Sequence, residues 1–369
     1  MGNGTYANLG SAFTAVNSGS QSGATISISV SGSTVETASA VLNAGAWNSI
    51  TIQPSGGSAR TIYSIWPIQI AIDLNGADNV TIDGLNSGGN SLTIDHENIE
   101  DDCAAIRFIN DAKNNTIKRC TILNSSQAQD VSGQGAVIWF STAASSGSGN
   151  DNNTISYCNI TGAYIASIFW RLSQGIRSNG TSGRTNDNNT IDHCNIYDFG
   201  TDVSDGASIG INVADYSSGW TISNNKIYET SALSFSTSLQ EWKGIYINVN
   251  NTTNAGGFTI SGNTVGYANS SGTGTSTFAG GTNMVYGIVF NAVNSGTTST
   301  ISSNTIAGID QTSSRAPTTT SGPGTQVFTG VLVKNGPVSV TGNIIGSTSG
   351  TGSITVRSQQ TSAATTTCV

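Results

Sequence analysis

Three consecutive copies of the phrase Asn-Asn-Thr-Ile are followed closely by residues that could do chemistry. These residues are Lys118, Arg119, Tyr157, Asp192 and His193. A carboxylate, an imidazole and a phenol can transfer protons, and an aromatic ring with a polar tip can also bind a sugar. The group therefore predicts an acid–base cluster or a sugar-binding cluster. It also fits a solvated turn whose charges differ between copies, and the sequence alone favours that plainer interpretation.

The phrase before these residues recurs along most of the chain. Its Thr or Ser recurs every 31 to 41 residues, at Thr81, Thr116, Thr154, Thr190, Thr221, Thr259, Thr300 and Ser339. A period in this range, sustained over so many copies, indicates a stacked repeat architecture. Apolar and polar residues alternate within each copy, so each copy is predicted to be a β-strand.

A second alternating phrase stands before each copy, such as AIDLNG at 71–76 and GIYINV at 244–249. No repeat carries a helical pattern long enough to return the chain between parallel strands. The strands must therefore coil into a solenoid, with neighbours about 4.8 Å apart. Residues at the same place in each repeat should then form columns inside the solenoid.

One such column is predicted at a bend, four residues after each Thr or Ser. Its members are Leu85, Cys120, Cys158, Cys194, Asn225, Asn263, Asn304 and Asn343. Asparagine amides can bond to the amides above and below, and a thiol is a small side chain that is readily buried. We expect the three column cysteines to be buried and reduced. Cys103 and Cys368 lie outside the column, so they could be exposed and could be linked to each other.

These columns resemble those of the right-handed parallel β-helix of the pectate-lyase-like superfamily. The phrases GTYANLGSAFTAVNSG, VETASAVLNAG, IDLNGADNVTIDGL, RFINDAKNNTI and NNTIxxCxI are also similar to repeat modules of large secreted surface proteins of Bacteroidota-type bacteria. The resemblance implies an all-β, single-stranded, right-handed parallel β-helix and a secreted or cell-surface location. It implies no particular chemistry, because most such modules have none assigned.

The chain divides into three predicted parts. Residues 1–23 form an N-terminal cap, 24–357 form a β-helix of about ten coils, and 358–369 form a tail or linker. Tyr6, Leu9, Phe13 and Val16 stand at helical spacing, which predicts a short α-helix within residues 6–17. This helix would cover the exposed strand edges of the first coil.

The resemblance implies that catalytic groups would lie on the outward positions of the second phrase. The predicted outward row is Asp73, Arg107, Ile138, Arg177, Gly210, Tyr246, Val289 and Leu332, with Phe140 in the next row and Trp139 turned inward. Glycoside hydrolysis needs two carboxylates near each other, and elimination needs several for calcium together with a base. Asp73 is the one carboxylate in these rows, so this face is predicted to lack both arrangements.

Further candidates lie in segments that interrupt the repeat. Trp170 and Arg177 belong to the bulky segment 164–177, while Trp66 and Trp242 lie in other excursions. Their rings could stack on sugars or pack the loops against the solenoid. The acidic stretch 95–102 could bind calcium, although it lacks the spacing of a calcium loop and fits a solvated loop better. No other cofactor is expected.

Composition limits the possible partners. The net charge of −8 and the pI near 4.6 argue against nucleic acid, which requires a basic face. No run of eighteen apolar residues is present, so no membrane span is expected.

The sequence as a whole predicts a non-catalytic extracellular module that serves as a spacer, adhesin or assembly unit and possesses a polysaccharide site. The binding candidates are Lys118, Arg119, Tyr157, Trp170, Arg177, Asp192 and His193. The alternative is a polysaccharide lyase or glycoside hydrolase that acts on an acidic glycan. Self-association through an uncapped C-terminal end is a third possibility.

Overall fold

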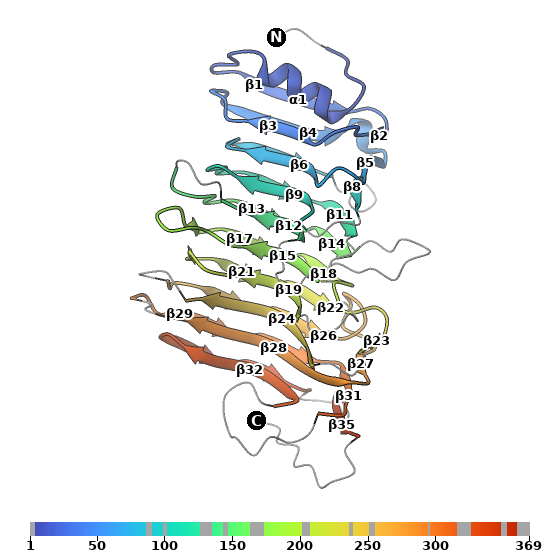
Figure 1. Ribbon diagram of the computed structural model, residues 1–369, viewed down its shortest axis with the longest axis vertical. Helices are drawn as coiled ribbons and strands as arrows, with labels where there is room; N and C mark the ends of the chain where they lie inside the picture. Colours follow the sequence, from blue (N-terminus) through green and yellow to red (C-terminus); the bar gives the residue numbers. More distant parts are fainter. Residues whose placement is uncertain are drawn as a thin grey trace.

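The computed structural model describes residues 4–85, 91–98, 102–125, 135–142, 147–162, 173–200, 207–235, 239–250, 255–293, 296–315, 326–347 and 353–359. Over these residues the chain is a right-handed parallel β-helix, an elongated stack of coils that runs from the N-terminus to the C-terminus (Figure 1). Three long sheets form its walls. Every strand in them pairs in parallel with the equivalent strands of the coils before and after it.

Sheet A contains ten strands, in the order β1 (Thr25–Val30), β4 (Ser49–Pro54), β7 (Val80–Asp83), β10 (Thr116–Lys118), β13 (Thr154–Ser156), β17 (Thr190–Asp192), β21 (Thr221–Ser223), β25 (Thr259–Ser261), β29 (Ser299–Ser302) and β33 (Val338–Thr341). These strands contain the recurring Thr-Ile phrase. The register pairs Thr with Thr and Ile with Ile from coil to coil, as in Ile82, Ile117 and Ile155. The predicted stacking of like residues is therefore confirmed for this sheet.

Sheet B also contains ten strands, in the order β2 (Thr34–Val35), β5 (Arg60–Ile65), β8 (Leu92–Glu97), β11 (Cys120–Ser125), β14 (Asn159–Gly162), β18 (Asn195–Tyr197), β22 (Lys226–Tyr228), β26 (Thr264–Gly266), β30 (Thr305–Ala307) and β34 (Ile344–Ile345). A very short turn joins each later strand of sheet A to the next strand of sheet B. Ile122, Ile160 and Ile196 are fully buried, so this sheet also presents its isoleucines to the interior.

Sheet C contains nine strands, in the order β3 (Ala40–Asn43), β6 (Ile70–Asn75), β9 (Ala104–Ile109), β12 (Ala136–Phe140), β15 (Gln174–Ser178), β19 (Ala207–Val213), β24 (Leu239–Val249), β28 (Thr282–Ala292) and β32 (Phe328–Asn335). Two smaller sheets accompany these walls. One pairs β16 (Asn186–Asp187) with β20 (Ser217–Ser218), and the other orders β23 (Leu233–Ser234), β27 (Ser276–Ala279), β31 (Ile309–Ser313) and β35 (Ile354–Ser358). A single-turn 3₁₀ helix spans Ser55–Gly57.

The interior is held by a column of amides and thiols at the turn between sheets A and B. The amide Nδ2 of Asn263 donates to the carbonyl of Ile222 on the preceding coil at 2.8 Å, and Asn225 donates in the same way to Ile191 at 2.9 Å. The backbone N–H of Asn225 in turn donates to Oδ1 of Asn263 on the following coil at 3.0 Å. Each side chain therefore bonds to backbone groups of both neighbouring coils.

The three cysteines occupy the same column and copy half of this pattern. The thiols of Cys120, Cys158 and Cys194 donate to the carbonyls of Ile82, Ile117 and Ile155 at 3.9, 3.7 and 3.6 Å, respectively. All three are free and buried, as predicted. A thiol can thus replace an asparagine here because it is small and still reaches the same carbonyl.

The column differs from the prediction in its first coil. Leu92 of β8, not Leu85, pairs with Cys120, and Ile94 pairs with Ile122. The chain makes a longer excursion at this turn, so counting residues from Thr81 gave the wrong partner. The exposure of Cys103 was left open by the sequence, and the structure shows it fully buried, with its thiol donating to the carbonyl of Ser125. Cys368 lies outside the described residues.

The predicted capping helix is α1 (Leu9–Asn17), and it buries Leu9, Phe13 and Val16. Glu36 clamps its start, because the two carboxylate oxygens accept the N–H groups of Leu9 and Gly10 at 2.9 and 2.8 Å. A carboxylate at this position satisfies free N–H groups and interacts favourably with the helix dipole. The helix lies across the N-terminal end of the stack (Figure 1).

Sheet C corrects the predicted outward row. Its pairs keep the same offset on either side of Gly175, Gly210, Gly244, Gly287 and Gly330, so these glycines stand opposite one another from coil to coil. A Cβ on Gly210 would lie 2.6 Å from the carbonyl oxygen of Gly244, so the next coil leaves no room for a side chain there. The glycines therefore mark the register of this sheet.

Two copies of the second phrase were aligned wrongly, AVIWFS by one residue and SIGINV by two. Trp139, not Ile138, is the outward residue that pairs with Arg107 and Arg177, and Phe140 faces the core, where it stacks on Phe108 at 4.4 Å. Asn212, not Gly210, continues the outward row. Trp139 therefore does not face inward as predicted, although it is buried in a small cluster with Ile70, Ala104 and Ala136.

Replacing Asn263 tests the amide column. Asn263→Ala leaves the N–H of Asn225 without its acceptor and the carbonyl of Ile222 without its donor. Each buried polar group left without a partner costs about 1–3 kcal/mol, so we expect the free energy of unfolding to fall by about 3 kcal/mol. Asn263→Cys keeps the donor to Ile222 and should lose about half as much. Urea unfolding followed by circular dichroism measures both variants. Equal stability of Asn263→Ala and the wild type would contradict the assigned role.

Candidate functional site

The turn between sheets A and B brings five of the predicted residues onto one edge of the solenoid. We call this edge the turn ridge and define it as Asp83, Lys118, Arg119, Tyr157, Asp192 and His193. Asp83, Lys118 and Asp192 occupy one row at the ends of their strands, since each pairs with the neighbouring coil in sheet A. Arg119, Tyr157 and His193 follow in the turn itself.

The backbone of the turn ridge is left-handed. Arg119, Tyr157 and His193 have φ values of 55°, 54° and 53°. Later coils place Asn224, Gly262, Ser303 and Gly342 at this position, with φ between 57° and 66° except at Ser303, where it is 55°. Glycine and asparagine adopt this conformation readily, whereas a bulky residue there costs about 1 kcal/mol or more. Three bulky side chains in strained positions make this edge a candidate functional site.

Asp83 binds the two cations of the turn ridge. Its Oδ1 accepts from Nε of Arg119 at 2.9 Å, and its Oδ2 lies 3.4 Å from Nζ of Lys118. Burial raises the pKa of Asp83, but the hydrogen bond from Arg119 and the charges of both cations outweigh it and hold that pKa below its usual value. Asp83 therefore stays ionised, and two cations share one carboxylate.

Tyr157 is the most exposed large side chain of the turn ridge. It is 55 % exposed, and its ring stacks on that of His193 with centroids 4.8 Å apart and planes 16° apart. Nδ1 of His193 lies 2.6 Å from Oδ2 of Asp192. Burial raises the pKa of Asp192, but hydrogen bonds from Ser223, His193 and Asn224 lower it by more. The two rings thus form a platform held from below by Asp192.

The remaining two predicted binding residues do not join the turn ridge. Arg177 belongs to β15 of sheet C, which forms a different wall of the solenoid. Its outward row contains Arg107, whose guanidinium bonds to Asp73 at 3.0 and 2.7 Å and lies 5.9 Å from the ring centroid of Trp139. Trp170 lies outside the described residues.

The other two candidate tryptophans have opposite environments. Trp242 is fully buried, packs against Phe199 and Phe278, and donates to Glu229 at 2.9 Å, so it is part of the core and does not bind sugar. Trp66 is 51 % exposed and precedes Pro67 through a cis peptide bond.

The acidic stretch contains no calcium loop in its described part. His96 is fully buried between Ser64 and Gln69, and burial lowers its pKa to about 4. Glu97 accepts from the hydroxyl of Tyr63 at 2.7 Å. Glu100 and Asp101 lie outside the described residues. Among the described residues, no group of three or more His, Cys, Asp and Glu side chains is placed to hold a metal ion.

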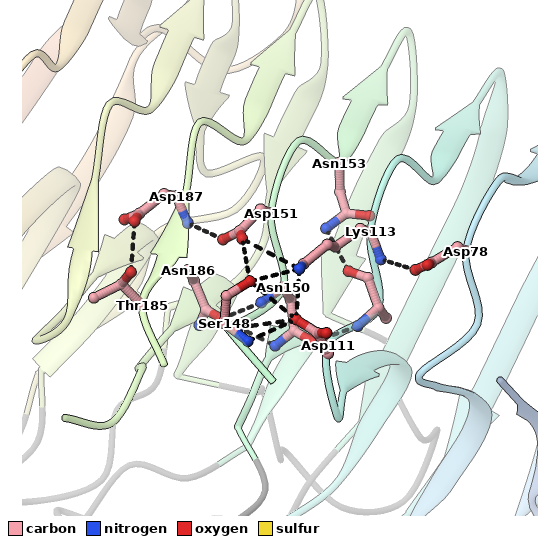
Figure 2. Close-up of polar contacts among 12 residues, drawn as sticks. Asp78, Asp111, Lys113, Ser148, Asn150, Asp151, Asn153, Thr185, Asn186 and Asp187 are labelled. Atoms are coloured by element: carbon pink, nitrogen blue, oxygen red, sulfur yellow. Dashed lines mark hydrogen bonds and ion pairs between the residues drawn. The ribbon is translucent and has the colours of Figure 1, made fainter. Parts of the chain in front are cut away.

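Figure 2 shows a polar network that the sequence interpretation missed, at the turn leading into sheet A. Nζ of Lys113 lies 2.8 Å from Asp111 and 3.9 Å from Asp151. Asp78 accepts the N–H of Lys113 at 2.7 Å, and Asp151 accepts the N–H of Asp187 at 2.8 Å. All of these contacts except the Lys113–Asp111 pair join adjacent coils. The signal was the charged column three residues before each Thr, at Asp78, Lys113, Asp151 and Asp187.

Solved structures similar to this chain share its architecture. PfbA, a surface adhesin of Streptococcus pneumoniae, is 12% identical over 95% of this chain and 88% of its own, with a TM-score of 0.50. An alginate lyase from Paenibacillus sp. str. FPU-7 is 13% identical over 95% of each chain, with a TM-score of 0.44. At such low identity the likeness to PfbA shows the fold alone. No protein-family model and no curated protein matches the chain.

The described part of the chain offers no helix with the length and apolarity required to cross a membrane.

The lowered pKa of Asp83 predicts a pH-dependent stability. A carboxyl whose pKa is lower in the folded chain stabilises it above the unfolded pKa of about 3.9, and this stabilisation is lost as pH falls through the lower folded pKa. Asp83→Asn should therefore be less stable than the wild type at pH 7, and the difference should shrink below about pH 4. The midpoints of urea unfolding between about pH 3 and pH 7 measure this difference in stability. Asp102→Asn is the control, because Asp102 is exposed. A difference independent of pH would rule out this role of Asp83.

Proposed function

We propose that the chain is a non-catalytic extracellular β-helix module that binds a polysaccharide through the turn ridge. The observation that carries this proposal is the exposed Tyr157 ring, stacked on His193 and flanked by cations on the neighbouring coil. A flat aromatic face with hydrogen-bonding groups around it suits a pyranose ring, which has apolar faces and polar edges.

The placement of charge in the turn ridge supports an anionic or polar partner. The whole chain has a net charge of −8, yet Lys118 and Arg119 share the single carboxylate of Asp83. Asp192, the second carboxylate of the ridge, lies on the coil after Tyr157 and holds His193, so the positive charge is local to Lys118 and Arg119 on the coil before it. A carboxylate or hydroxyl group of a sugar could approach this charge without displacing the existing ion pairs.

The state of the two carboxylates argues against a general-acid role for either of them. A general acid must hold a proton at the working pH, and enzymes raise the pKa of a carboxyl for that purpose. The pKa values of Asp83 and Asp192 are instead lowered, because both side chains accept several hydrogen bonds. Such carboxylates position their neighbours, and here they position Arg119, His193 and the ring that stacks on His193.

The stiffness of the fold supports a role at a surface. A solenoid whose coils are bonded on three walls transmits position over its whole length, as a spacer or adhesin requires. PfbA shows that a similar fold can serve as a surface adhesin.

The proposal predicts that Tyr157→Ala weakens polysaccharide binding by at least about fivefold, because the stacking platform is lost. Affinity electrophoresis and calorimetry against alginate, polygalacturonate, xylan and mixed-linkage β-glucan measure this effect. Tyr6→Ala is the matched control, since Tyr6 is 39% exposed and lies at the N-terminal end of the molecule, away from the turn ridge.

Binding that is equally strong in Tyr157→Ala would remove the turn ridge as the site. The same panel of polysaccharides also distinguishes a binding module from the alternative function, an enzyme. Release of unsaturated products or new reducing ends, lost in His193→Ala, would show a polysaccharide lyase or glycoside hydrolase in place of a binding module.

A further inference from the structure

The surface of sheet A changes character along the stack, starting at the turn ridge. From β21 onward the outward positions carry only hydroxyl groups. We call these residues the hydroxyl track, and they are Thr221, Ser223, Thr259, Ser261, Thr300, Ser302, Ser339 and Thr341. The left-handed turn beside them carries Asn224, Gly262, Ser303 and Gly342, so no charge or bulky ring lies at its edge.

The hydroxyl track is continuous with the turn ridge. Ser223 donates to Asp192 at 2.6 Å, and Asn224 donates to the same oxygen at 3.0 Å, which joins the last ridge coil to the first track coil. Beyond this link, the hydroxyls of Thr259, Ser261 and Thr300 make no side-chain hydrogen bond within the described residues. The isoleucines between them are fully buried, which fixes the threonines on the outer face.

The dimensions of the two surfaces fit a long linear ligand. The ridge spans the three strand spacings from β7 to β17, about 14 Å, and the ridge with the track spans the seven from β7 to β33, about 34 Å. One extended sugar residue is similar in length to one strand spacing. A polysaccharide lying parallel to the solenoid axis would therefore meet one coil with each sugar residue.

Resting on the function proposed above, we infer that the ligand is an extended linear polysaccharide that runs along the solenoid axis from the turn ridge over the hydroxyl track. The ridge supplies the stacking platform and the cations, which bind one short stretch of the chain. The track supplies one or two hydroxyl groups per coil, and these exchange hydrogen bonds with the hydroxyls of successive sugar residues. Affinity then grows with chain length well beyond the reach of the ridge.

The test measures the affinity of each variant for a short and a long oligosaccharide. The probes are size-fractionated oligomannuronate, oligogalacturonide, xylo-oligosaccharide and cello-oligosaccharide of about three and about eight residues, matched to the two spans. The double variant Thr259→Val and Thr300→Val removes two hydroxyls while keeping the shape and the strand preference. We expect about tenfold weaker binding of the long oligomer and unchanged binding of the short one. Thr51→Val, in the same row but on the opposite side of the ridge, is the control and should change neither.

The outcomes separate this inference from the function on which it rests. Equal affinity of the long and short oligomers, or a long-oligomer affinity unchanged in the double variant, would overturn the track while Tyr157-dependent binding stood. An equal loss of long-oligomer affinity in Thr51→Val would contradict the inference that the ligand runs from the ridge toward the hydroxyl track. Absence of any Tyr157-dependent binding would overturn the proposed function itself. Circular dichroism and urea midpoints confirm that the variants are folded.

Discussion

The structure depends on one interaction, the bond between an inward side chain at the turn and the backbone carbonyl of the coil before it. A parallel solenoid must satisfy the backbone groups of its turns without water, because the turn residues that face inward are buried. Asn225, Asn263 and Asn304 do this with their amides, and Cys120, Cys158 and Cys194 reach equivalent carbonyls with their thiols. This interaction fixes the height of each coil relative to the next.

The candidate site is a consequence of this constraint. The turn between sheets A and B has a fixed inward residue on each side. One residue between them therefore adopts the left-handed backbone conformation. That residue faces away from the core, so its side chain is free to vary. Most coils use glycine, asparagine or serine there, but three adjacent coils present Arg119, Tyr157 and His193. In the row beside them, Asp83 pairs with Lys118 and Arg119 of the next coil, and Asp192 pairs with His193 of its own coil.

The sequence predicted the fold and the turn ridge well, because both follow from a period that is visible in the residues. The Thr-Ile phrase places Lys118, Arg119, Tyr157, Asp192 and His193 at equivalent points of adjacent coils, and the structure brings these five together. The capping helix was also predictable, from the spacing of Leu9, Phe13 and Val16.

The errors arose where the spacing between repeats changes. Two copies of the second phrase were set out of register by one and two residues, so Trp139 was predicted to face inward and Phe140 outward. The longer turn after Asp83 placed Leu92 where Leu85 was expected. The sequence left open whether Trp242 packs or binds sugar and whether Cys103 is exposed, because local sequence carries no signal of the contacts that bury both side chains.

The central claim is that equivalent residues lie one above another along a straight axis, one strand spacing apart. Spin labels at Asn79 and Thr298, both exposed and at equivalent turn positions, test it by electron–electron double resonance. They are separated by the six spacings from β7 to β29, so the account predicts a narrow distribution near about 29 Å. Moving the first label to Asn114 should shorten the distance by about 4.8 Å. Broad distributions, or a distance that does not change by one spacing, would contradict the stacked columns and the site built on them.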